Sequence, residues 1–187
     1  MAISQRVRSS TMRPRALTEA LLHAYATNER VNQYLIGYLD DAAWTAKPPS
    51  GRGRTIGAIV AHIHNVRRMW LKTTAPGERL PAPLSRHSAS RADAQAALAE
   101  SHRALASVLR RSFAGDLRVK GFAPDAAAFL AYLIAHESHH RGQIAMLARQ
   151  VGHPVPQHAM FGMWEWSARA KEVAPVSARS RAVSPRF

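Results

Sequence analysis

Apolar residues recur at three- and four-residue intervals along four long segments of the chain. Residues with this spacing share one face of an α-helix, so the pattern predicts four amphipathic helices. Their expected ranges are residues 17–39, 55–72, 90–113 and 124–151. A shorter amphipathic stretch at residues 159–171 predicts one extra helix after them. No stretch shows the strict alternation of apolar and polar residues, bounded by turn signals, that predicts a β-strand.

Turn and capping residues separate these segments. Thr55 and Ser90 stand where the second and third helices need an N-cap, and Pro124 suits the first turn of the fourth. Residues 40–53 contain a Pro-Pro pair and two glycines and are expected to form a loop. Four helices of roughly 18–28 residues predict an all-α four-helix bundle with a short extra C-terminal helix. The proline-rich connection after the second helix is long enough to cross the bundle, so a simple up-down-up-down order is not required.

Length and composition fit one domain of this kind. The chain has 187 residues, of which 47% are apolar, and this is enough for one packed core. The expected division is a basic disordered tail at residues 1–15, a metal-binding bundle at 16–172 and a second basic disordered tail at 173–187. The chain contains no cysteine, which excludes disulfides, thiolate metal sites and a cysteine nucleophile. A metal must therefore bind to His, Asp or Glu, and any reacting thiol must come from outside the protein.

The formal net charge of the chain is +14, and most of this excess lies near its two ends. Residues 1–15 and 167–187 together carry +8, which leaves +6 for residues 16–166. A basic protein is a candidate for binding nucleic acid, but charge in the tails is weak evidence for a specific site. Specific nucleic-acid binding is therefore not expected. No run of apolar residues reaches the length of a membrane span, so we expect a cytoplasmic protein with no membrane partner.

Five of the ten histidines lie in two short motifs. In the fourth predicted helix, His136 and His140 are one turn apart, on a face that also carries Leu133, Ile144 and Leu147. That face is expected to point into the bundle, where two imidazoles can bind one ion at about 2.0–2.1 Å. A phosphate-binding glycine-rich loop and a GxSxG serine motif are both absent, so the enzyme classes that depend on them are excluded.

The second predicted helix offers a third ligand for such an ion. His62 falls on its apolar stripe, whereas His64 is about 200° further round the helix and is expected to face solvent or the edge of the bundle. His62, His136 and His140 together would leave a coordination position open for water or substrate. The alternative is that each inward histidine is a core residue with its own partners, but burying three imidazoles without a shared partner is costly. His139 is expected at the margin of the bundle.

Polar and aromatic residues near the histidines have more than one interpretation. Glu137 is either a base or an acceptor beside the metal ligands, or it forms an i, i+4 ion pair with Arg141, and the ion pair is favoured. Arg67 and Arg68 either attract an anionic substrate or belong to a solvated face. The C-terminal aromatic residues form a packed terminal helix, a lid over the metal pocket or a dimer interface, and the packed helix is favoured. These aromatic residues are Phe161, Trp164 and Trp166.

Two motifs of the chain resemble those of the DinB/YfiT-like family, which is unrelated to the translesion polymerase of similar name. Residues 55–63 (TIGAIVAHI), with Trp70 after them, resemble the second-helix motif of that family. Residues 136–144 (HESHHRGQI), followed by Gly152 and Pro154, resemble its HExxHRGQ signature. The resemblance implies an up-down-down-up bundle, often dimeric, with a divalent ion, typically zinc or nickel, on three histidines.

The resemblance covers about residues 15–155 and carries expectations for the site. On the matching positions the metal ligands are His62, His136 and His140, with His64 as the alternative to His62. Three neutral imidazoles leave the charge of the ion uncompensated, which lowers the pKa of a bound thiol or water. Known members of the family include S-transferases and isomerases that use low-molecular-weight thiols such as mycothiol or bacillithiol.

These expectations define three functional hypotheses. The first is a metal-dependent enzyme that transfers a metal-activated, low-molecular-weight thiol to a small electrophilic substrate. The alternatives are a metal-dependent hydrolase of a small amide or ester and a non-enzymatic, stress-associated metal-binding protein. Zinc or nickel is the expected ion. A small-molecule substrate and a second copy of the chain, as a homodimer, are the expected partners.

Overall fold

The computed structural model describes residues 14–122 and 125–172 of the chain. These residues form seven α-helices and no β-strand, which confirms the all-α prediction. Pro124 and the two predicted tails, apart from Pro14 and Arg15, lie outside the described residues. None of the described helices combines the length and the apolar character that crossing a membrane requires.

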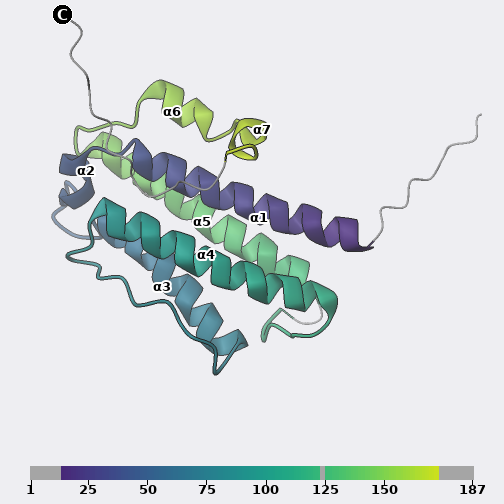
Figure 1. Ribbon diagram of the computed structural model, residues 1–187. Helices are drawn as coiled ribbons and strands as arrows, with labels where there is room; N and C mark the ends of the chain where they lie inside the picture. Colours follow the sequence, from purple (N-terminus) through teal and green to yellow (C-terminus); the bar gives the residue numbers. More distant parts are fainter. Residues whose placement is uncertain (1–13, 123–124, 173–187) are drawn as a thin grey trace, which may run out of the picture.

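Four long helices make up the bundle, and they match the four predicted segments. They are α1 (Pro14–Gly37), α3 (Ile56–Thr74), α4 (Arg91–Ala114) and α5 (Ala126–Gln150). Helices α1 and α5 run in one direction and α3 and α4 in the other (Figure 1), so the order is up-down-down-up. The connection at residues 75–90 makes this possible because it returns the chain along the bundle before α4 begins. Each of α1 and α3 packs against both α4 and α5.

Side-chain caps fix where three of these helices begin. The Thr55 side chain accepts a hydrogen bond from the backbone N–H of Ala58, which confirms its predicted N-cap role. Ser90 and Asp93 form a reciprocal capping box at the start of α4. The cap of α5 is Asp125, whose side chain accepts from the backbone N–H of Ala127.

Two short elements differ from the sequence-based expectation. Residues 40–53 were expected to form a loop, but they include α2 (Asp41–Thr45). Helix α2 is held by Trp44, which is buried and donates its indole N–H to the backbone oxygen of Ala89 at 2.9 Å. The single helix expected at residues 159–171 is also wrong, because this stretch forms α6 (Gln157–Gly162) and α7 (Trp166–Arg169). Both short helices lie on the side of α1 and α5 that faces away from α3 and α4 (Figure 1).

The core of the bundle has two apolar clusters with a polar layer between them. Along each of the four long helices, residues of one cluster are followed by polar residues and then by residues of the other cluster. The buried side chains of this layer come from all four helices. They are Asn28, Glu29, Asn32, His64, Arg67, Ser101, Glu137 and His140. The candidate site lies at this level of the bundle.

Candidate metal centre

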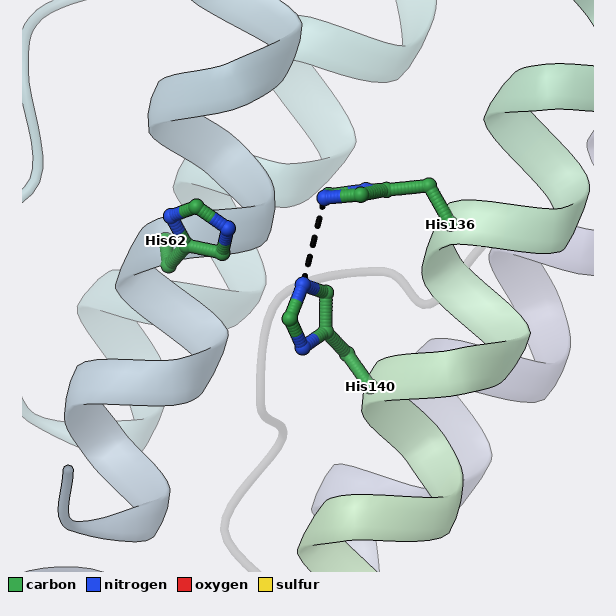
Figure 2. A group of neighbouring side chains, drawn as sticks. All are labelled: His62, His136 and His140. Atoms are coloured by element: carbon green, nitrogen blue, oxygen red, sulfur yellow. Dashed lines mark hydrogen bonds between the residues drawn. The ribbon is translucent and has the colours of Figure 1, made fainter. Parts of the chain in front are cut away.

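Three imidazoles meet between α3 and α5 (Figure 2). His62 comes from α3, and His136 and His140 come from successive turns of α5. One ring nitrogen from each residue lies within 4.8 Å of those of the other two. Two nitrogens on one ion are at most about 4.2 Å apart, so small side-chain rotations suffice to bring all three onto a shared ion. The structure therefore brings together the three histidines that the sequence singled out.

Two ring nitrogens of the cluster, both from α5, lie within hydrogen-bond distance of each other. The Nε2 atoms of His136 and His140 are 3.1 Å apart. Two nitrogen lone pairs do not face each other at this distance without a proton or a cation between them. The His140 ring is held by Gln143, whose Oε1 atom is 2.7 Å from His140 Nδ1. A hydrogen on Nδ1 therefore satisfies Gln143 and leaves the Nε2 lone pair of His140 free to bind a metal.

All three imidazoles favour the neutral form, which is the form that binds metal ions. Burial, together with the positive charge of Arg54 as a smaller cause, lowers the pKa of His62 to about 4. Burial also lowers the pKa of His136 and of His140. The rings of His62 and His136 are only partly buried, so the cluster is reachable from solvent. Neutral, clustered and accessible imidazoles are suited to a transition metal.

Gln143 is a residue that the sequence analysis left without a role. Besides His140, it contacts the exposed His139, with its Nε2 atom 3.0 Å from His139 Nε2. Its position three residues after His140 places it on the same face of the helix, and this spacing was the signal available in the sequence. Hydrogen bonds of this kind orient metal-binding histidines and select the nitrogen that binds the metal. His139 lies at the exposed margin, as predicted.

Glu137 is directed into the bundle and not toward the three imidazoles. Its carboxylate accepts hydrogen bonds from Arg67 Nε and Nη2 at 2.8 Å each, and from the side-chain amides of Asn28 at 2.6 Å and Asn32 at 2.7 Å. Burial raises the pKa of this carboxyl group, but Arg67 and the hydrogen bonds outweigh it and hold the pKa below its usual range. Glu137 is therefore an ionised, fully engaged carboxylate inside the bundle.

The expected ion pair between Glu137 and Arg141 is wrong. The charged partner of Glu137 is Arg67, whereas the Arg141 guanidinium donates to the Oδ1 atoms of Asn28 at 2.9 Å and Asn32 at 2.6 Å. The two asparagines bridge these groups, because each donates its amide to Glu137 and presents its oxygen to Arg141. These hydrogen bonds join α5 to α1, which lies more than a hundred residues earlier in the sequence. Local spacing in the sequence therefore does not reveal them.

Both expectations for Arg67 are also wrong. Arg67 is 1% exposed, so it neither belongs to a solvated face nor attracts a substrate from solution. Its Nη2 atom donates to Glu29 at 2.7 Å, and its Nη1 atom donates to the backbone oxygen of Leu98 at 2.9 Å. Arg68 is partly buried, and its Nε donates to the backbone oxygen of Pro81. Glu29, Arg67 and Glu137 form a buried ionic network that joins α1, α3 and α5.

His64 also differs from its expected place. It was expected to face solvent or the edge of the bundle, but it is fully buried. Its Nδ1 atom is 3.1 Å from Ser101 Oγ and its Nε2 atom is 2.8 Å from the backbone oxygen of Ala82. Helix α4 and the connection at residues 75–90 cover this face of α3, which the periodicity of α3 alone does not show. With both ring nitrogens engaged there, His64 is not part of the cluster around His62.

The C-terminal aromatic residues do not cover the three histidines. Ser138 and Gly142, which lie beside Trp164 and Trp166 in a shared pocket, each follow a cluster histidine by two residues. A two-residue step is about 200° around the helix, so this pocket is on the opposite side of α5. The terminal helices pack on α1, where the Arg169 guanidinium lies 3.9 Å from the centre of the Tyr34 ring. Trp164 itself is 80% exposed.

Comparison with known proteins gives one family match. The chain matches the profile of the DinB family over residues 12–172. This range includes all seven described helices, and it contains all three histidines of the cluster. Searches of curated proteins and of solved structures found no match to the chain.

Proposed function

The chain belongs to the DinB family, and from that premise we propose that His62, His136 and His140 hold one divalent transition metal in a metal-dependent enzyme. The observation that carries this proposal is the convergence of three neutral imidazoles from two helices, two of them partly exposed. The cluster contains no carboxylate, and an all-imidazole set suits zinc or nickel better than calcium or magnesium. Three protein ligands leave room for a fourth group, as in catalytic zinc sites.

The proposed reaction is the transfer of a low-molecular-weight thiol to a small electrophilic substrate. A bound ion of this kind lowers the pKa of a thiol or water at its open position, and it makes that group a better nucleophile at neutral pH. The chain has no cysteine of its own, so the reacting thiol comes from a separate small molecule. Low-molecular-weight thiols are kept reduced inside cells, and the proposal accordingly places the reaction in the cytoplasm.

The residues of the chain have distinct parts in this proposal. His62 and His136 present their rings at the accessible side of the cluster, and Gln143 fixes which nitrogen of His140 faces it. The buried ionic network ties Arg67, five residues after His62, to Glu137, the neighbour of His136. It therefore sets the spacing between the two helices that carry the ligands. Glu137 has a positioning role here and not that of a base, because both of its oxygens are engaged.

Metal content tests the site first. Purified, tag-free protein should contain about one equivalent of a transition metal by elemental analysis, after reconstitution with Zn²⁺ or Ni²⁺ if needed. His62→Ala should lose it, whereas the control variant His139→Ala, which changes an exposed histidine next to the ligands on α5, should keep it. Wild-type protein that stays empty after reconstitution would overturn the metal site.

Activity tests the reaction class. Loaded protein should consume a thiol-reactive electrophile such as monobromobimane faster when mycothiol or bacillithiol is present, and His62→Ala should abolish the acceleration. Hydrolysis of a small ester or amide without added thiol would favour the alternative hydrolase. Metal binding with neither activity would favour the non-enzymatic, stress-associated role. Sedimentation velocity tests the proposed homodimer, which a monomer at all concentrations would exclude.

A further inference from the structure

The two histidines of α5 differ in what holds their rings. His140 is held by a hydrogen bond, with Gln143 Oε1 2.7 Å from its Nδ1 atom. For His136, the side-chain hydrogen-bond contact among the described residues is the one between its Nε2 atom and that of His140. This nitrogen faces the other histidines (Figure 2), on the side where an ion would bind. The plane of the His136 ring therefore depends on how the ring is packed.

Tyr132 packs against His136 with its ring nearly parallel to the imidazole. The planes of the two rings differ by 20° and their centroids are 5.9 Å apart, which is a stacked arrangement. The other two rings beside His136 cross it at steeper angles, 54° for His62 and 82° for His140. Tyr132 precedes His136 by one turn of α5, so the two side chains lie on the same face of that helix.

Tyr132 is itself held in place by aromatic neighbours. Its ring centroid is 5.5 Å from that of Trp70, which comes from α3, and 5.2 Å from that of Phe122. Both of these rings also pack against Phe129, which is fully buried. Rings that are packed on several sides do not rotate freely. This aromatic group therefore joins α3 to α5 and holds the tyrosine ring against His136.

An aromatic ring at this position also suits a histidine that binds a cation. A metal ion withdraws electron density from the imidazole that holds it, which leaves the ring partly positive. The face of a tyrosine ring is negative, and it attracts a positive charge placed above it. A leucine side chain at position 132 would fill space without this attraction.

We infer that Tyr132 is a positioning residue of the metal centre, which fixes the plane of the His136 imidazole and stabilises that ring when it holds the ion. This inference rests on the proposed metal site. Tyr132 acts through His136, and the inference assigns it no contact with substrate. Each ligand on α5 then has a support of its own, a hydrogen bond from Gln143 for His140 and a stacked ring for His136.

The affinity of the full chain for Zn²⁺, measured by competition with a chromogenic chelator, is the first test. Tyr132→Leu should bind Zn²⁺ about ten-fold more weakly than the wild type, a loss typical for residues that support a metal ligand. Tyr132→Phe keeps the ring and should bind like the wild type. The matched control is Phe129→Leu, because Phe129 has no ring contact with Tyr132 or His136 among the described residues. It should keep the wild-type affinity.

The outcomes of this test separate the inference from the proposed function. Wild-type affinity in Tyr132→Leu would overturn the inference and leave the metal site in place, whereas a wild-type protein that binds no metal would overturn the proposed function itself. An equal loss in Tyr132→Phe would assign the effect to the phenol hydroxyl and overturn the role of the ring. An equal loss in Phe129→Leu would reduce the effect to general packing and would also overturn the inference. Tyr132→Met replaces Tyr132→Leu if circular dichroism shows that the leucine variant does not fold.

A second measurement tests the ring contact without a metal. The imidazole of His136 is stacked on Tyr132, so the ring current of the tyrosine shifts the NMR signals of its carbon-bound protons upfield. In the metal-free protein these signals, assigned by their absence in His136→Gln, should move downfield in Tyr132→Leu and stay in place in Tyr132→Phe. Signals that do not move in Tyr132→Leu would show that the two rings are not stacked in solution. That result would overturn the inference whatever the metal content of the protein.

Discussion

Two groups of polar side chains lie at the same level of the bundle, and they differ in how far their interactions are completed within the protein. In the buried ionic network, Glu29, Arg67 and Glu137 pair with one another over distances of 2.7–2.8 Å. In the histidine cluster, three imidazoles face one another with no carboxylate among them. The network is complete without a ligand, and its role is to hold three helices together. The cluster has room for a shared ion, and the proposed metal site would use it in this way.

The largest effect should follow from breaking the network. Arg67→Met leaves two carboxylates buried without their cation, which should lower the free energy of unfolding by about 3–5 kcal/mol. Urea denaturation at pH 7.5 measures this loss. Arg103→Met, at an exposed position on α4, should change stability by less than about 0.5 kcal/mol. A loss of under 1 kcal/mol for Arg67→Met would show that the network does not hold the three helices together.

A metal ion bound to the histidine cluster should instead raise the free energy of unfolding. Zn²⁺ that binds the folded state alone should raise the free energy of unfolding by about 2.7 kcal/mol at one hundred times its Kd. Thermal melts with and without a chelator measure the gain. His139→Ala should show the same gain and His62→Ala none, and an equal gain in both variants would place the bound ion elsewhere.

Removing the side chain that orients His140 should have a smaller effect. Gln143→Ala frees the His140 ring to rotate, which should weaken metal binding 10- to 100-fold without abolishing it. Competition with a chromogenic chelator measures the affinity. The matched control is Gln150→Ala, an exposed glutamine at the end of the same helix. Equal affinities for the two variants would remove Gln143 from the site.

His102 sharpens the comparison because it lies beside the ionic network but forms no hydrogen bond with it through its buried Nδ1. Its ring packs on Tyr25 at 4.5 Å between centroids, and its buried Nδ1 has no hydrogen-bond partner among the described residues. Burial lowers the pKa of His102 to about 4, opposed by the charge of Glu29. The unfolded chain therefore binds this proton more readily than the folded protein. The contribution of His102 to stability is complete above pH 6.5, the ordinary pKa of histidine, and is lost as the pH falls toward 4.

The expected slope from this one group is about 1.4 kcal/mol per pH unit between those two values. Urea denaturation at a series of pH values measures it, and His102→Phe should flatten the curve by this amount. Since the cluster histidines also have lowered pKa values, part of the slope should persist in the variant. A variant whose curve matches that of the wild type would contradict the assignment.

The elements of the fold that leave a local pattern in the sequence were predictable. The four long helices follow from apolar periodicity, and the start of α4 follows from the capping box of Ser90 and Asp93. Helix α2 was missed because five residues are too few to show a period. It is held by a tertiary contact, the hydrogen bond from Trp44 to Ala89, which lies 45 residues further along the chain.

In the candidate site, too, residues with a local sequence pattern were predictable and residues that depend on tertiary contacts were not. His136 and His140 are one turn apart on one helix, and His62 lies on an apolar stripe, so spacing alone selected them. The partners of Glu137 and the burial of His64 were not predictable in this way. Both depend on which helix covers which face, and a connection that crosses the bundle decides this. Arg67 shows the limit most clearly, because an arginine near the middle of a helix gives no local signal of being buried.

The position of α5 in the chain has a consequence for how the protein is made. Helix α5 is the last of the four long helices to leave the ribosome, and it carries His136, His140 and Glu137. Until it emerges, α1, α3 and α4 have no fourth partner, and the apolar faces that it will cover stay in contact with water. Domains of this size fold as units once their elements are available. We therefore expect the nascent chain to acquire its core, its ionic network and its capacity to bind metal in one late step of synthesis.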